Sequence, residues 1–120
     1  MADDFDAALD AFDDAIRVGL VRGVQEVTED LKRESQNLVP YDQGDLSRSA
    51  KTSLDTTGPT VQGAVSYDTE YAVRQHEEVT WRHQDGRTAK YLATPLRANV
   101  ARYEEHIAQA IRAETEDSAK

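Results

Sequence analysis

The feature that most constrains this fold is a run of apolar side chains at helical spacing in the first third of the chain. They recur at steps of three or four, the period of one helical face. The run comprises Phe5, Leu9, Phe12, Ile16, Leu20, Val24, Val27 and Leu31. Pro40 lacks an amide hydrogen and disfavours a helical Val39, so we expect a long helix over residues 1–37. Such a rod is about 45–50 Å long. A domain this small cannot cover it, so part of the stripe should meet another subunit.

The middle of the chain, residues 38–93, predicts a small antiparallel sheet. Residues 48–54 are compatible with a strand, and residues 55–59 (Asp-Thr-Thr-Gly-Pro) have the composition of a turn. Residues 60–67 alternate, which places Val61, Gly63, Val65 and Tyr67 on one face. Residues 69–76 fit a short helix, and residues 77–88 form a polar loop. Leu46, Val61, Val65 and Tyr71 are expected in the core.

A second helix is expected over residues 94–114. Thr94 is a suitable N-cap and Pro95 suits the first helical position. Leu96, Val100, Tyr103, Ile107 and Ile111 would form its apolar stripe. The pattern is lost over residues 115–120, which we expect to fray. The prediction is therefore one α+β domain: a long N-terminal amphipathic helix, a small antiparallel β-sheet and a C-terminal helix.

The charge balance narrows the classes of partner. The chain has 120 residues, a formal net charge of −9, and 23 acidic against 14 basic side chains. That excess opposes a sequence-independent grip on nucleic acid and docking on anionic membranes. It is common in proteins of high-salt or GC-rich hosts, but it would also simply keep a subunit soluble before assembly. There are no cysteines and no apolar run long enough to span a membrane, which fits assembly in a host cytoplasm.

The chain has few residues in patterns typical of metal binding or catalysis. His76, Glu77, Glu78, His83 and Asp85 are potential metal ligands, but the two histidines are seven residues apart, which is wrong for a helical His-Glu-x-x-His pair. A solvated loop has the same composition. No serine lies in a nucleophile elbow and no glycine-rich phosphate loop is present. We therefore predict no enzymatic activity, cofactor or metal.

The candidate contact residues are apolar or aromatic. Trp81 stands alone in the polar loop beside Arg82 and His83, where it would contact a partner or pack on the domain's own core. With the start of the apolar stripe, the candidate subunit contacts are Phe5, Phe12, Ile16, Trp81, Arg82 and His83.

A set of spaced markers carries a family resemblance. The segment Val39-Pro40-Tyr41-Asp42-Gln43-Gly44-Asp45-Leu46 resembles the Pro-x-x-x-Gly-x-Leu signature of tailed-phage neck proteins, variously labelled head–tail connector, tail-completion or minor capsid proteins. Gln43 replaces the usual Thr. Tyr67 to Ala72, His76-Glu77, Lys90-Tyr91-Leu92 and Pro95-Leu96 resemble the later motifs of that family in order. The structural markers are Pro40, Gly44, Leu46, Tyr71 and Pro95.

The resemblance implies a structural role in a virion. Such proteins form a ring, sixfold or twelvefold, between portal-adaptor and tail-tube proteins in the neck. The ring joins the DNA-filled head to the tail, and DNA passes through it without sequence-specific binding. Two alternatives stay open: a tail terminator or capsid-associated minor protein, and a small metal-dependent enzyme or toxin using His76, Glu77 and His83.

Overall fold

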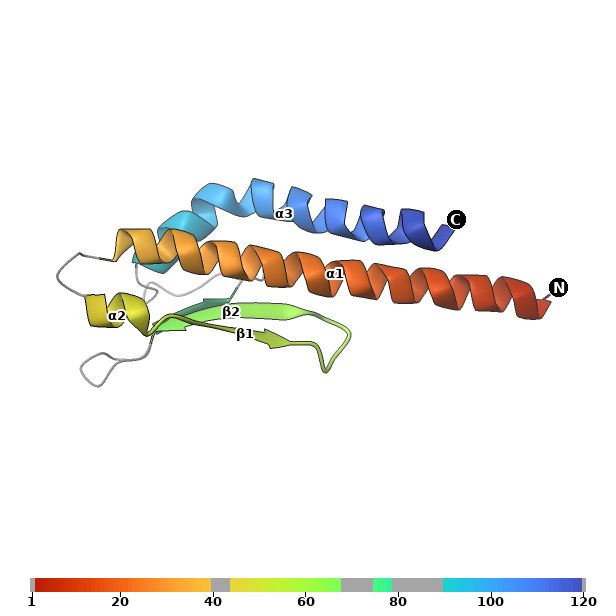
Figure 1. Ribbon diagram of the computed structural model, residues 1–120, viewed down its shortest axis with the longest axis horizontal. Coiled ribbons are helices and arrows are strands. Elements are labelled where there is room, and N and C mark those ends of the chain that lie inside the picture. Colours follow the sequence, from red (N-terminus) through yellow and green to blue (C-terminus); the bar gives the residue numbers. More distant parts are fainter. Residues whose placement is uncertain (1, 40–43, 68–74, 79–89, 120) are drawn as a thin grey trace.

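A computed structural model describes residues 2–39, 44–67, 75–78 and 90–119. The fold is α+β, as the sequence predicts, with two long helices and a small antiparallel sheet. Helix α1 (Ala2–Leu38) is the spine of the molecule, and in Figure 1 it lies between helix α3 (Lys90–Ala119) and the sheet. The molecule is elongated, with extents of 64 × 25 × 24 Å.

Helix α1 confirms the predicted N-terminal helix to within one residue at its end. Its 37 residues span about 55 Å at 1.5 Å per residue. The backbone amide of Val39 donates to the carbonyl of Gln36 at 3.3 Å, which closes the last turn. The side chain of Val39 then turns into the core. Pro40, the predicted cause of the stop, lies outside the described residues.

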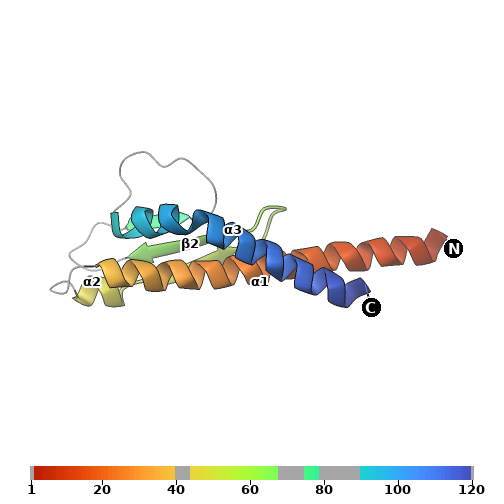
Figure 2. The ribbon, with the colours of Figure 1, turned by 90° about the horizontal axis from the view of Figure 1, so that it is seen from above.

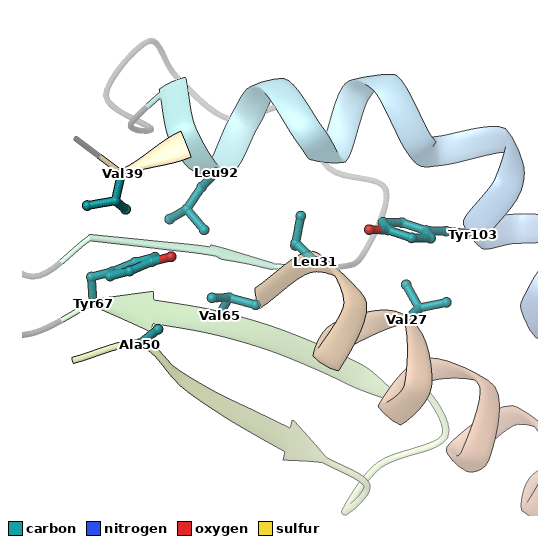
Figure 3. Packing of buried hydrophobic residues seen from close by; sticks show 8 residues of the cluster. All are labelled: Val27, Leu31, Val39, Ala50, Val65, Tyr67, Leu92 and Tyr103. Atoms are coloured by element: carbon teal, nitrogen blue, oxygen red, sulfur yellow. The ribbon is translucent and has the colours of Figure 1, made fainter. Parts of the chain in front are cut away.

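The core occupies one end of the molecule, where all three layers meet (Figure 3). The C-terminal half of the α1 stripe faces the sheet and the first turns of α3. The buried cluster consists of Val27, Leu31, Val39, Ala50, Val65, Tyr67, Leu92 and Tyr103. Leu96 and Ile107 pack against it. Val61 and Val65 are buried as predicted, and side-chain positions for Leu46 and Tyr71 are outside the description.

One buried polar pair joins the helix to the sheet inside this core. The hydroxyl of Ser35 donates to the carbonyl of Lys32 at 2.8 Å, and it lies 2.6 Å from the hydroxyl of Tyr67. The two hydroxyls share a hydrogen bond. Burial raises the pKa of Tyr67, and the bond to Ser35 offsets this only in part. Tyr67 therefore stays neutral across the physiological range.

The sheet has the strand order β1–β2–β3, all antiparallel. Strand β1 is Lys51–Asp55, β2 is Gln62–Tyr67 and β3 is Gln75–Glu78. Lys51 pairs with Ser66 and Asp55 with Gln62, so the predicted hairpin is confirmed. The inward face of β2 alternates as predicted, with Gly63 close against α1 at Thr28.

Three local predictions around the sheet are wrong. Residues 44–48 form a short helix, α2 (Gly44–Arg48), so Arg48 is not in a strand. Gln75 and His76 belong to β3 rather than to a helix, and Glu77 and Glu78 belong to β3 rather than to a loop. Pairing with β2 explains β3, because backbone hydrogen bonds stabilise a polar strand that its own sequence does not favour.

Helix α3 is longer at both ends than predicted. It begins at Lys90, so Thr94 is not its N-cap and Pro95 lies inside it. Leu92 and Ala93 are buried, and this packing stabilises the added first turn. Pro95 removes one helical hydrogen bond, and the axis of α3 changes direction in its first half (Figures 1 and 2). At the other end the helix continues to Ala119. Glu114, in its last turns, pairs with Arg22 of α1.

The two long helices approach most closely at two glycines of α1. A methyl group on Gly19 would lie 2.6 Å from the Cα atom of Ile111, and one on Gly23 would lie 2.9 Å from the Cα atom of Ile107. Ala110, between these two contacts on α3, is buried. The helices therefore touch through their backbones, and any larger residue at either glycine would push α3 away.

We predict that Gly19→Ala lowers the free energy of unfolding by about 1–3 kcal/mol, because overpacking outweighs the gain of about 1 kcal/mol that alanine brings to a helix. Chemical denaturation followed by circular dichroism measures the change. Gly58→Ala is the control, since no atom lies within 4 Å of its added methyl group. Equal effects at the two positions would contradict the close contact.

Candidate interaction surface on the long helix

The apolar stripe of α1 is divided into a covered part and an exposed part. Val24, Val27 and Leu31 are buried, whereas Phe5 is 64%, Leu9 46% and Phe12 45% exposed. Ile16 and Leu20 are half-buried between them. The stripe runs continuously from the core onto open surface, so α1 carries more apolar face than its own domain covers.

The start of the exposed part lies where α1 extends past the rest of the molecule. In both Figure 1 and Figure 2 the N-terminus of α1 projects beyond the C-terminus of α3, and β1 and β2 lie toward the other end. Within the described ranges, no other helix or strand is seen alongside the first turns. We call residues 2–16 the arm.

The arm is strongly acidic. It carries six aspartates and no Lys, Arg or His, so its formal charge is −6 out of −9 for the chain. The helix dipole favours carboxylates near the first turn, which accounts for Asp3, Asp4 and Asp6. Asp10, Asp13 and Asp14 lie beyond the reach of that effect and are exposed. The helix dipole therefore does not account for these three carboxylates.

The arm ends at Arg17, whose guanidinium binds the turn between β1 and β2. It donates to the carbonyls of Thr56 at 2.6 Å, Gly58 at 2.9 Å and Pro59 at 3.1 Å. Asp55 shapes the same turn by accepting from the amide and hydroxyl of Thr57 at 3.0 and 2.7 Å, and these bonds lower its pKa. Arg17 thus ties the hairpin to α1 at the point where the covered stripe begins.

A second polar cluster clamps α1 to α3. Asp30 accepts from the hydroxyl of Tyr103 and from the guanidinium of Arg102, each at 2.7 Å, and also from Arg33. The guanidinium carbon of Arg102 lies 4.9 Å from the centre of the Tyr103 ring, within cation–π range. All of these donors point at one carboxylate.

The cluster changes the acidity of its members. Burial by itself would raise the pKa of Asp30, but hydrogen bonds from Tyr103, Arg102 and Arg33 outweigh it and lower the pKa from 3.8 to about 2. Burial and then the bond to ionised Asp30 raise the pKa of Tyr103 above its usual range. Asp30 is thus an ionised acceptor and Tyr103 a neutral donor, which is the arrangement of a structural clamp rather than of a proton-transfer pair.

A shallow depression beside this clamp has no catalytic arrangement. It is lined by Arg22, Glu26, His106, Gln109 and Ala110. Nε2 of His106 lies 3.3 Å from Glu26, and Nε of Arg22 lies 3.7 Å from the same carboxylate. These side chains are about half exposed, so the pairs contribute at most about 1 kcal/mol each.

The structure places some of the predicted site residues and not others. Phe5 and Phe12 lie exposed on the arm, and Ile16 lies half-buried where the arm joins the body. Trp81, Arg82 and His83 lie outside the described residues, as do Pro40 and Tyr71. Gly44 opens α2, Leu46 lies within it, and Pro95 is buried inside α3.

The possible metal ligands are only partly described. His76 and Glu77 are neighbours in β3, in register with Ser66 and Val65 of β2, while His83 and Asp85 lie outside the described ranges. Among the residues that are described, no group of three or more His, Asp, Glu or Cys side chains is placed to hold a metal ion.

Sequence reasoning missed two contacts that help to hold the long helices together. The glycine pair Gly19 and Gly23 had a visible signal, since two glycines four residues apart in a helical run lie on one face and permit close packing. The Asp30 clamp had none, because Arg102 and Tyr103 lie more than seventy residues away in the chain.

Comparison with known protein families, curated proteins and solved structures finds no match to this chain. The resemblance to neck proteins therefore stays a prediction from the sequence. In the described part of the chain, none of the helices combines the length and apolar character needed to cross a membrane.

We predict that Asp30→Asn lowers the free energy of unfolding at pH 7 by about 1–2 kcal/mol. The pKa of Asp30 is lower in the folded than in the unfolded protein, so its ionised form stabilises the fold. That contribution is complete above about pH 4 and is lost as the pH falls toward 2. Urea titrations between pH 7 and pH 2.5 measure it, with exposed Asp13→Asn as control. A deficit that did not shrink at low pH would contradict the clamp.

We also predict that amide hydrogens of the arm exchange at least about a hundredfold faster than those of residues 23–35, because a short uncovered helix is marginal in water. Hydrogen exchange followed by mass spectrometry or NMR measures both segments in one sample. Equal protection in dilute protein would show that the arm is already covered.

Proposed function

We propose that this chain is a structural subunit of a tailed virus, one that forms a ring in the neck between the DNA-filled head and the tail and lines part of the DNA conduit. The observation that carries the proposal is the continuous stripe of α1, buried in the body and exposed along the arm. A face of this kind suits a protein that completes its fold against neighbours. The ordered marker set from Pro40 to Leu96 is the reason for choosing the neck.

The geometry of the arm favours association with a neighbour over folding back. Phe5 and Phe12 are separated by about 10 Å along the helix. Both continue the line of the buried stripe, so a partner that covers them also extends the core. When one subunit offers an arm and the next a receiving surface, the contact is heterologous, and repetition of it closes a ring if the rotation permits.

The acidic character of the chain supports passage of DNA better than retention of it. Net charge −9 repels phosphates, and a conduit must not hold the DNA that passes through. The cation-rich patches that nucleic-acid-binding proteins use do not occur on the arm, where every charged residue is an aspartate.

We predict that virus lacking this protein accumulates DNA-filled heads and free tails that do not join. Electron microscopy of the lysate, with the wild-type gene supplied in trans, gives the readout. Complementation by a Phe5→Ser/Phe12→Ser variant should fail, because both substitutions remove apolar surface from the arm. Val18→Ser is the matched control, since Val18 is 53% exposed but lies on the opposite side of α1.

Two outcomes would overturn the proposal. Infectious, fully joined particles without the protein would exclude a joining role. Labelled protein found at the far end of the tail or across the capsid surface, instead of at the neck, would favour a tail terminator or a capsid-associated minor protein.

A further inference from the structure

The exposed stripe of the arm has a charged border on one edge. Each of its apolar residues is followed directly by an aspartate, in the pairs Phe5-Asp6, Leu9-Asp10 and Phe12-Asp13. Successive residues of a helix are about 100° apart, so these three carboxylates lie in a row beside the apolar row. All three are exposed. The arm therefore presents an apolar ridge with a row of carboxylates along one side, which we call the acidic row.

This arrangement restricts the kinds of surface that can cover the ridge. A second arm would bring twelve carboxylates together while burying apolar surface between them, and like charges at an interface are costly. Anionic lipid and nucleic acid are repelled for the same reason. A protein surface with an apolar groove and Lys or Arg along one rim matches both rows at once.

We infer that the arm docks through Phe5, Leu9 and Phe12 into an apolar groove of a different protein surface, one whose rim carries basic side chains facing Asp6, Asp10 and Asp13. This inference names the chemistry of the partner and rests on the proposed function, in which the chain is an assembling subunit. The apolar side chains supply affinity, and the acidic row sets the orientation of the arm in the groove. If the arm bound in the reverse orientation, the basic side chains of the rim would be left unpaired.

Two synthetic helical peptides with the same leucine stripe test the inference. One has lysine and the other glutamate at every polar position flanking the stripe, and each is titrated into the full chain by isothermal calorimetry. We expect binding of the lysine peptide only, weakened at least about tenfold between 50 and 500 mM salt because exposed charges are screened.

Variants of the full chain separate docking from simple charge attraction. Phe5→Ser/Phe12→Ser should weaken binding of the lysine peptide at least about tenfold, while Phe5→Leu/Phe12→Leu should retain it. Asp10→Asn/Asp13→Asn should weaken it as well. Glu104→Gln/Glu116→Gln is the matched control, because it removes the same charge from exposed positions of α3. Thermal melts confirm that each variant is folded, and the aspartate variants decide the matter if the serine variant is not.

The inference is overturned by any of three results: equal binding of both peptides or of neither, binding that ignores the Phe substitutions, or self-association of the full chain by arm-to-arm contact in sedimentation experiments. None of these depends on where the protein sits in a particle. Absence of the protein from the neck would overturn the proposed function alone, so the two failures are distinguishable.

Discussion

The backbone contact between α1 and α3 at Gly19 and Gly23 sets the geometry of the rest of the structure. With Ile107 and Ile111 seated against these glycines, the two helices run antiparallel at a separation that larger side chains would not allow. The polar pairs along the seam then come within bonding distance, including Arg22 with Glu114 and the clamp on Asp30. The crossing shown in Figure 2 also determines where cover ends, because α3 stops short of the start of α1.

The stripe of α1 serves two purposes that differ only in what lies opposite. In the body it packs on β2 and α3, and burial stabilises it. On the arm the same spacing continues, but Phe5, Leu9 and Phe12 are largely exposed, and this is the surface proposed for association. Arg17 marks the change, because its three bonds to the hairpin turn hold the last piece of the sheet against α1. The lean core and the proposed interaction surface therefore lie at two ends of one amphipathic helix.

Much of the fold could be predicted from local patterns, and the errors have a common cause. The long helix, the hairpin turn and the inward face of β2 follow from spacing and from turn residues. Strand β3 and the start of α3 do not follow from local patterns. Gln75–Glu78 becomes a strand through pairing with β2, and Lys90–Thr94 becomes helical through burial of Leu92. Of the candidate site, Phe5 and Phe12 were found from the stripe, whereas Asp30 with Arg102 depends on a contact between distant segments.

By itself, the sequence determined the amphipathic period of α1, the end of that helix near Pro40, the acidic charge of the arm and the apolar face of β2, because each depends only on neighbours along the chain. The tertiary structure alone decided which part of the stripe is core and which part is surface. That division depends on where α3 and the sheet lie against α1, and the crossing at Gly19 and Gly23 places them. Phe5 and Leu31 belong to the same pattern, yet one is exposed and the other buried, because only Leu31 has the rest of the fold beside it.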